Sequence, residues 1–564
     1  MKKIFLLIGI FSFYSNAQNF EWAKQISSSN TSYCSSVTVD DNSGYVYSTG
    51  TFSGTVDFDP GSGIYNLTAT VNTTNIYILK LDLNGNFIWA KQITCSSCES
   101  NTIKTDFSGN VYIVGGYSGL TDFDPSITTY NLNSAGALDI FISKYDSNGN
   151  LVFAKGMGST DMDRAYSLDI DSFGNIYITG TFIGTTDFDS SSNVFNLITE
   201  PDTTSAFILK LDLNGNFIWA KNIGSYSIGR GIVSDPLGNS YITGTFNGTA
   251  DFDPSNNTFD LIDVGVGSVF ILKLDVNGNF VWAKSIGNID DQTNSRYITK
   301  DEFGNIYIAG YFIGTNDFDP NEGGFLMSSL GTSYNGFITK LDFNGNFIWA
   351  KGIFGTGFTY LDSITTDNQG SVYCSGEFFA TMDFNPSNTV NFNLTSVGSV
   401  DAFIAKLDSN GNFLFAKQIG SLGYDRGNGI ALDDNKNIYS AGTFAGVADF
   451  NPDNSATYIL TPQNTNFEAF IQKMNQPNLS LMDHVNESKF KVYPNPTTGL
   501  ISIDSDVYHN KIKINVKNIL GQIIMKKEYD YIKIINLDFD GSPGNYFLEI
   551  ISDNTITTMK IIKK

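Results

Sequence analysis

Short runs of alternating hydrophobic and polar residues, separated by Gly and Asn, fill most of the chain. In one stretch, residues 167–171 and 176–182 flank a Gly-Asn pair, and residues 207–212 and 217–221 flank Asn-Gly. Alternation with a period of two predicts half-buried strands. Asn-Gly between two such runs is typical of a tight hairpin, because both residues tolerate positive φ. The stretch therefore predicts four antiparallel strands and no helix.

This four-stranded stretch recurs along the chain. Each copy contains Asp-Phe followed by Asp or Asn, at intervals of 64 to 66 residues. The copies start at Asp57, Asp122, Asp187, Asp251, Asp317, Asp383 and Asp449. Four-stranded sheets repeated about 4 to 8 times are typical of the blades of a β-propeller. The period therefore predicts seven blades.

The two ends of the array each hold half of one repeat. Residues 19–24 match only the last strand of the second hairpin, and residues 470–473 match only the strand before it. A last blade completed by the N-terminal strand would close the ring and leave no unpaired edge. An open solenoid would need polar caps, and none is visible. The predicted fold class is all-β, with a seven-bladed β-propeller over residues 18–474 closed by the N-terminal strand.

Residues 1–17 have the features of a secretory signal peptide. Two lysines precede an apolar run over residues 4–13, and Ser15-Asn16-Ala17 supplies small residues for cleavage. About 10 apolar residues are too few for a bilayer core that needs about 20. We therefore predict export and no transmembrane segment.

The repeat resembles a known family. Residues 301–312 contain a Gly-Asn turn followed by Tyr-x-x-Gly-x-Phe, which is similar to the SBBP-type β-propeller repeats of secreted bacterial proteins. The resemblance covers residues 18–474. It implies the fold and says almost nothing about activity.

A second domain follows a polar linker at residues 475–487. Residues 488–564 carry short alternating strands that predict a small Ig-like β-sandwich. Their motifs are Tyr493–Gly499, Ile519–Gln522, Gly544–Leu548 and the basic end Lys560–Lys564. These resemble the C-terminal sorting domain of type IX secretion substrates in the Bacteroidota. The resemblance implies the type IX machinery as a partner, export across both membranes, and either release or attachment at the cell surface. The alternative is an ordinary terminal sandwich used for adhesion or packing.

Charge and histidine content limit the chemistry. Lys plus Arg number 34 against 57 Asp plus Glu, a net charge of −23, which argues against nucleic-acid binding. The only histidines are His484 and His509. Residues 18–474 therefore lack histidine-based triads and histidine-ligated metals. No cofactor is predicted. The Asp-Phe-Asp segments offer carboxylates to calcium, but a turn with a buried Phe explains them better.

The cysteines suit an exported protein. Cys95 and Cys98 form a Cys-x-x-Cys pair, and Cys34 lies near the position equivalent to Cys98 one repeat earlier. We predict a disulfide among these three and a buried Cys374.

The candidate ligand-binding residues lie where the repeats differ. In an antiparallel meander, the connections between blades and between the second and third strands share one face. These connections are long and variable here, and the segments leading into the first strands hold all four arginines. The candidates are Asp161, Asp163, Arg164, Arg230, Asp290, Asp291, Arg296, Tyr424, Asp425 and Arg426. Alternatively, each arginine pairs with a neighbouring aspartate and only holds its loop.

Three functions fit the sequence. The first is a non-enzymatic protein that binds a glycan or a protein through the long-loop face. The second is an extracellular enzyme that acts on polysaccharide with paired carboxylates about 5 to 10 Å apart. The third is a structural repeat protein of the cell envelope. No catalytic residue is assigned.

Overall fold

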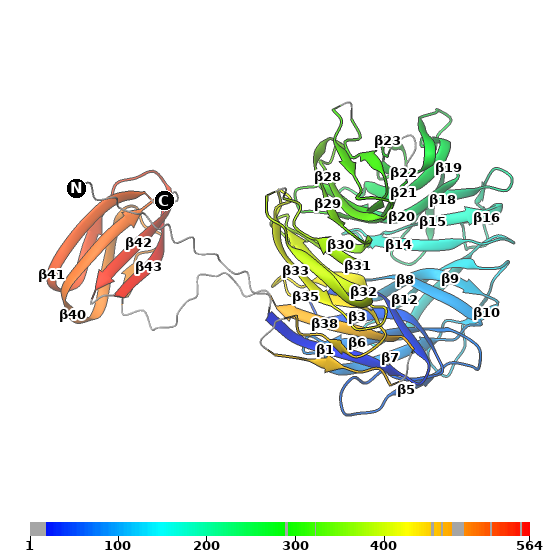
Figure 1. Cartoon of the computed structure of the whole chain (residues 1–564), viewed down its shortest axis with the longest axis horizontal. Helices are drawn as coiled ribbons and strands as arrows, with labels where there is room; N and C mark the ends of the chain where they lie inside the picture. Colours follow the sequence, from blue (N-terminus) through cyan, green and yellow to red (C-terminus); the bar gives the residue numbers. More distant parts are fainter. Residues whose placement is uncertain are drawn as a thin grey trace. The chain divides into compact units, whose positions relative to one another are not determined.

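The computed structural model divides the chain into two compact units, Met1–Pro477 and Asn478–Lys564. Every regular element in the described part is a β-strand (Figure 1). The described residues are 19–287, 292–321, 323–387, 389–452, 456–463, 466–475, 490–518, 522–552 and 555–564. The predicted signal peptide, nearly all of the predicted linker, and Asp290 and Asp291 lie outside them.

The first unit consists of four-stranded antiparallel sheets that share one strand order. One is β14 (Arg164–Ile170), β15 (Ile176–Ile183), β18 (Thr204–Leu211) and β19 (Phe217–Ser225), paired in that order as the sequence predicts. The others are β2 (Thr31–Asp40), β3 (Tyr45–Ser53), β6 (Asn75–Asp82), β7 (Phe87–Ile93); β8 (Ser97–Thr105), β9 (Val111–Ser118), β12 (Asp139–Tyr145), β13 (Leu151–Met157); β20 (Ser227–Ser234), β21 (Ser240–Asp251), β22 (Asp260–Leu274), β23 (Phe280–Ile286); β24 (Thr293–Lys300), β25 (Ile306–Phe312), β28 (Asn335–Leu341), β29 (Phe347–Gly355); and β30 (Thr359–Thr366), β31 (Val372–Asp383), β32 (Asn393–Leu407), β33 (Phe413–Ile419).

Short hairpins connect the second strand of a sheet to the third. They are β4 (Thr55–Asp57) with β5 (Asn66–Thr68), β10 (Leu120–Asp122) with β11 (Asn131–Asn133), β16 (Thr185–Asp187) with β17 (Asn196–Ile198), β26 (Thr315–Asp317) with β27 (Leu326–Ser328), and β36 (Ala448–Asp449) with β37 (Ile459–Leu460). In β21–β22 and β31–β32 the hairpin is continuous with the long strands.

The Asp-Phe-Asp segments form turns in these hairpins, as predicted. Oδ1 of Asp57 accepts the backbone N–H groups of Asp59 at 3.1 Å and Tyr65 at 2.8 Å. The phenylalanine of each copy is almost fully buried: Phe58, Phe123, Phe188, Phe252, Phe318, Phe384 and Phe450.

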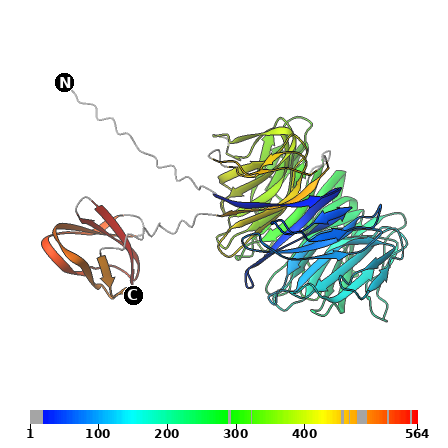
Figure 2. The same ribbon diagram turned by 90° about the horizontal axis from the view of Figure 1, so that it is seen from below.

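One sheet combines the two ends of the first unit. It contains β34 (Arg426–Leu432), β35 (Ile438–Phe444), β38 (Glu468–Asn475) and, from the start of the chain, β1 (Asn19–Ser28). Ala23 pairs with Gln472, and Ile26 with Ala469. Figures 1 and 2 show the blue N-terminal strand beside the orange one. The two halves of the split repeat therefore lie in one sheet.

The first strands of all these sheets line one cavity of about 190 Å³. Its aliphatic lining comes from equivalent positions of β2, β8, β14, β20, β24, β30 and β34, namely Val37, Ile103, Leu168, Ile232, Ile298, Ile364 and Ile430. The sheets therefore surround a common axis, and the start of each first strand lies at the same end of it.

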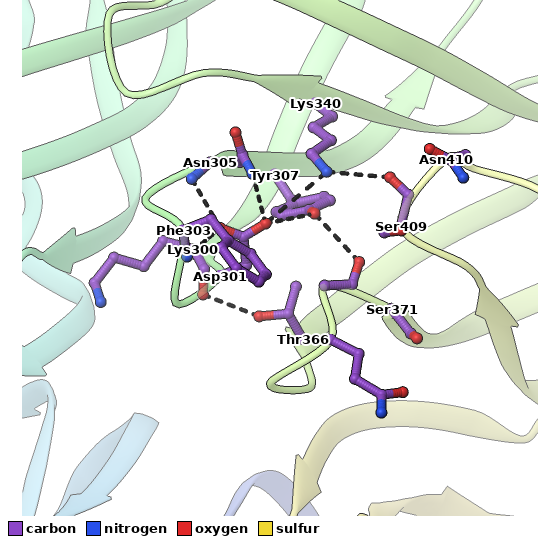
Figure 3. A network of polar contacts seen from close by, with 12 residues as sticks. Lys300, Asp301, Phe303, Asn305, Tyr307, Lys340, Thr366, Ser371, Ser409 and Asn410 are labelled. Carbon is purple, nitrogen blue, oxygen red and sulfur yellow. Dashed lines mark hydrogen bonds and ion pairs between the residues drawn. The ribbon is translucent and has the colours of Figure 1, made fainter. Parts of the chain in front are cut away.

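In six of the sheets, a lysine on the third strand joins the sheet to the next one; five of these lysines are buried and Lys273 is half-buried. In Figure 3, Lys340 Nζ donates to the Ser409 carbonyl at 3.1 Å and lies over the Tyr307 ring. The Tyr307 hydroxyl donates to Asp301 at 2.9 Å. The equivalent lysine-to-carbonyl bonds are Lys80–Ser147, Lys144–Leu213, Lys210–Val276, Lys273–Phe343 and Lys473–Leu83.

The second unit contains β39 (Phe490–Tyr493), β40 (Leu500–Lys517), β41 (Ile523–Asp538), β42 (Gly544–Ser552) and β43 (Thr555–Lys563). The sequence predicts separate strands at 500–504 and 511–516, but both lie in the long β40. The two halves look separate in sequence because they have different partners. The first half pairs with β39 and the second with β42, while β41 pairs with both.

The lysine contact between sheets gives a stability prediction. Lys340→Met keeps most of the stem but loses the bond to Ser409 and leaves buried Asp301 without its nearby cation. We expect the free energy of unfolding to fall by about 2 kcal/mol. Chemical denaturation would measure it. Lys351→Met, on the half-buried outer strand β29, is the control and should cost under about 0.5 kcal/mol.

Candidate functional site

Each first strand contains a β-bulge at the same position. In β14 the register shifts between Ala165 and Ser167, and in β20 between Gly229 and Gly231. A bulge leaves one residue unpaired and redirects its side chain. We call these unpaired residues the bulge residues. They are Ser35, Asn101, Tyr166, Arg230, Arg296, Asp362 and Asn428.

The glycine of the Tyr-x-x-Gly-x-Phe motif makes room for the bulge. A Cβ on Gly180 would lie 1.8 Å from the Arg164 carbonyl oxygen, and one on Gly244 would lie 1.9 Å from that of Ile228. The same clash, at 2.0 Å or less, occurs in the other sheets at Gly50, Gly115, Gly310, Gly376 and Gly442. Only glycine fits opposite the bulge, which explains why this glycine recurs in every copy.

Two bulge residues bridge neighbouring first strands. Asn101 Nδ2 donates to the Ala165 carbonyl at 2.8 Å, and Asn428 Nδ2 donates to the Cys34 carbonyl at 2.7 Å. Each acceptor residue directly precedes the bulge residue of the next first strand. The bulge side chains therefore form a belt at the end of the cavity where the long connections enter.

Three of the four arginines pair with a carboxylate from a neighbouring sheet. Arg164 Nε lies 3.1 Å from Glu99, and Arg296 Nη1 lies 3.6 Å from Asp362. Arg426 binds Glu377 with two nitrogens, at 2.5 and 2.9 Å. The sequence alternative of an arginine–aspartate pair applies to Arg296, although Asp362 lies on another strand, whereas Arg164 and Arg426 pair with glutamates. The partners lie on β8, β30 and β31, so these pairs link sheets.

Arg230 differs from the other three. Among the described residues, no carboxylate lies within ion-pair distance of it. Its guanidinium lies over the Tyr166 ring at 4.5 Å. Burial lowers the pKa of Arg230, and the neighbouring Arg296 also lowers it. A cation is therefore held in partly buried surroundings beside a second cation.

Aromatic side chains form one wall beside the arginines. The Tyr311 ring lies 5.2 Å from Tyr334 and 4.6 Å from Tyr360, and the Arg296 guanidinium lies 5.3 Å from Tyr311. Phe358 extends this wall, with its ring 5.1 Å from Tyr360. We call Tyr311, Tyr334, Tyr360 and Phe358 the aromatic wall. Half-exposed rings beside cations suit stacking of a planar or sugar-like ligand face.

Two predicted ligand-binding aspartates lie below the surface instead. Asp163 and Asp425 are both 0% exposed. Asp163 accepts the N–H groups of Ser159 and Ile183, and Asp425 accepts those of Ser421 and Ala445. These carboxylates hold the loops before β14 and β34, because a buried carboxylate must have hydrogen-bond donors.

Of the two other predicted residues in the described ranges, Tyr424 lies beside an arginine and Asp161 does not. Tyr424 accepts a hydrogen bond from Arg426 Nη2 at 3.0 Å, whereas Asp161 is exposed on its loop. The structure instead brings Asp362 and Glu377 to the belt. Burial raises the pKa of Asp362, while Arg296 lowers it. Each of these carboxylates faces an arginine, which favours ion pairing over proton transfer.

The aromatic wall and Glu377 were missed in the sequence, although the motif gives a signal for two of these residues. The residue after the motif glycine is Thr in four copies and Gly in one. The exceptions are Tyr311 and Glu377. A comparison of this single position across the copies would have identified both.

The four cysteines are of two kinds. Cys95 and Cys98 are joined by a disulfide, whereas Cys34 and Cys374 are free and buried. In the described ranges, no group of three or more His, Cys, Asp or Glu side chains is arranged to hold a metal ion. No helix of this part is long and apolar enough to cross a membrane.

The comparisons with known proteins match both units. Residues 414–443 match the β-propeller repeat family called SBBP, and residues 491–564 match the secretion system C-terminal sorting domain. The chain therefore contains a β-propeller repeat and a C-terminal sorting domain, as its motifs predict, and the sorting domain points to secretion.

Two individual proteins are similar to this chain. An uncharacterized WD repeat-containing protein, L264, from Acanthamoeba polyphaga mimivirus is 26% identical over 433 residues. The match covers 64% of this chain and 31% of that protein. A crystal structure of a protein of unknown function from Bacteroides caccae has 9% identity and a TM-score of 0.28, covering 61% of this chain and 89% of that one.

The buried Asp425 gives a pH prediction. Burial raises its pKa to about 6, so the folded state favours the protonated acid. Stability from this group is present below the unfolded pKa and is lost as the pH rises through 6. Between pH 4.5 and 7.5, we expect the wild type to lose on the order of 2 kcal/mol of unfolding free energy relative to Asp425→Asn. Urea denaturation at both pH values measures this; a constant difference would contradict it.

Proposed function

We propose that this protein is a secreted, non-enzymatic seven-bladed β-propeller that binds a glycan through the long-loop face. The pairing of β1 with β38 and the cavity lined by every first strand support a closed ring. The sorting domain supports export by a type IX system in a member of the Bacteroidota, with the mature protein at the cell surface or released.

The binding role rests on the belt of bulge residues and the aromatic wall. A common scaffold of glycine, bulge and aliphatic lining repeats in each sheet, while the bulge positions carry seven residues of five different types. Variation restricted to one end of an otherwise uniform repeat is typical of a binding surface. The clustered tyrosine rings, in which Tyr311 meets its neighbours edge to face, favour a glycan over a protein as the ligand, because sugar faces stack on aromatic rings.

The enzymatic alternative has one supporting observation. Asp362 and Glu377 interact electrostatically, so two carboxylates are close together on the predicted face. However, each is paired with an arginine. A polysaccharide hydrolase needs one carboxyl group free to hold a proton. The pairing therefore favours binding.

Ring closure predicts that β1 stabilises the last sheet. A chain that begins at residue 29 would leave the outer edge of β38 unpaired and expose Phe470 and Ile471. We expect its thermal midpoint to fall by at least about 5 °C. A peptide of residues 19–28, added in excess, should restore part of the loss. An unchanged midpoint would contradict closure.

Glycan binding is tested with a glycan array and a polysaccharide-turnover assay on the chain from residue 19. Tyr360→Ala and Tyr311→Ala should weaken binding about tenfold, since each removes one stacking ring. The control is Phe303→Ala, which removes an exposed ring in the turn between β24 and β25, on the face opposite the long connections. Turnover of any polysaccharide would overturn the non-enzymatic assignment, and loss of binding in the control alone would overturn the site.

A further inference from the structure

Arg230 and Arg296 occupy the same bulge position on successive first strands, β20 and β24. Equivalent residues on adjacent strands around one axis lie close together, and the two guanidiniums are near enough for Arg296 to lower the pKa of Arg230. Like charges placed side by side in partly buried surroundings are costly unless an anion binds between them. The guanidiniums of Arg230 and Arg296 therefore repel each other, and an anion bound between them would relieve this repulsion.

The local charge balance is positive, against the trend of the chain. Among the described residues, the belt and its ion pairs contain four guanidiniums, those of Arg164, Arg230, Arg296 and Arg426, and three carboxylates, those of Glu99, Asp362 and Glu377. One positive charge is left over, in a protein whose net charge is −23. Within the described ranges the excess falls on Arg230, whose guanidinium lies over the Tyr166 ring and has no carboxylate at ion-pair distance.

Arg296 is only partly committed to Asp362. Its contact is a single one, at 3.6 Å, whereas Arg426 holds Glu377 with two nitrogens at 2.9 Å or less. The Arg296 side chain is also 42% exposed. A guanidinium with free N–H groups facing solvent can bind a carboxylate with its planar fork. Arg296 therefore has donors available for a ligand anion beside Arg230.

We propose that Arg230 and Arg296 form a carboxylate-binding subsite, so that the ligand is an acidic glycan rich in uronic acid. The sugar ring stacks on the aromatic wall beside Arg296 while its carboxylate is held between the two guanidiniums. This inference rests on the proposed glycan binding and adds the class of glycan. Asp362 competes with the ligand carboxylate for Arg296.

The test compares two forms of one polymer on the chain from residue 19. Polygalacturonate carries a carboxylate on every sugar, and its fully methyl-esterified form has the same backbone without charge. We expect the acid form to bind at least about tenfold more tightly by calorimetry. Arg230→Gln should remove this preference and leave the affinity for the ester unchanged within about twofold. Arg230→Lys should restore it in part, because the charge returns without the fork.

Asp362→Asn separates a binding role from a structural one. Removal of the competing carboxylate frees Arg296, so affinity for polygalacturonate should rise, whereas a purely structural ion pair would give a loss. Lys155→Gln, on the outer strand β13, removes one positive charge away from the belt and should change nothing. Equal thermal midpoints would show that each variant is folded.

The outcomes distinguish the two proposals. Equal binding of both polymer forms, unaffected by Arg230→Gln, would overturn the carboxylate subsite and leave glycan binding intact. Binding of polyglutamate instead of polygalacturonate would overturn a glycan as the source of the carboxylate. If no glycan binds, the proposed function fails. The subsite is then judged with inorganic sulfate, which should raise the thermal midpoint of the wild type and not of Arg230→Gln; no difference would overturn the subsite as well.

Discussion

The buried lysine between sheets is the contact on which the rest of the first unit depends. Six of the sheets are held to the next one at a hairpin carbonyl, and the lysine that donates to it is almost fully buried at Lys80, Lys210 and Lys340. Burial lowers the pKa of these lysines. The charge is retained because the tyrosine ring and the aspartate beneath it offset the desolvation. A neutral side chain could pack there, but only a directional donor sets how far one sheet is offset from the next.

The bulge is the second repeated constraint, and it separates scaffold from site. Each bulge requires a glycine at the opposite position of the second strand, because any Cβ there would overlap a carbonyl oxygen. In return, one residue per first strand is freed from the ladder and from core packing. The aliphatic positions two residues further along, such as Ile232 and Ile298, must fill the cavity, whereas Arg230 and Arg296 need only fit the bulge. The side chain at a bulge position can therefore vary without disturbing the aliphatic lining of the cavity.

Sequence reasoning succeeded where residues act locally. The hairpins, the buried phenylalanines and the split repeat follow from period, turn residues and copy number, and the structure has each of them. It failed where partners come from another sheet. Arg426 pairs with Glu377, 49 residues away, and not with its neighbour Asp425, which caps a loop below the surface. No local pattern specifies such a pair, because it depends on the angle at which two sheets pack.

The distribution of the bulge residues around the axis follows from this division. Asn101 and Asn428 use their amides to bridge neighbouring first strands, so these positions reinforce the ring. Tyr166, Arg230, Arg296 and Asp362 lie on four successive strands between them, and the aromatic wall lies on the same side. The side chains around the axis are therefore asymmetric although the repeats are nearly identical. A repeat array can acquire a directional cluster of side chains in this way, because the motif glycine, the lysine contact and the aliphatic lining occupy positions other than the bulge.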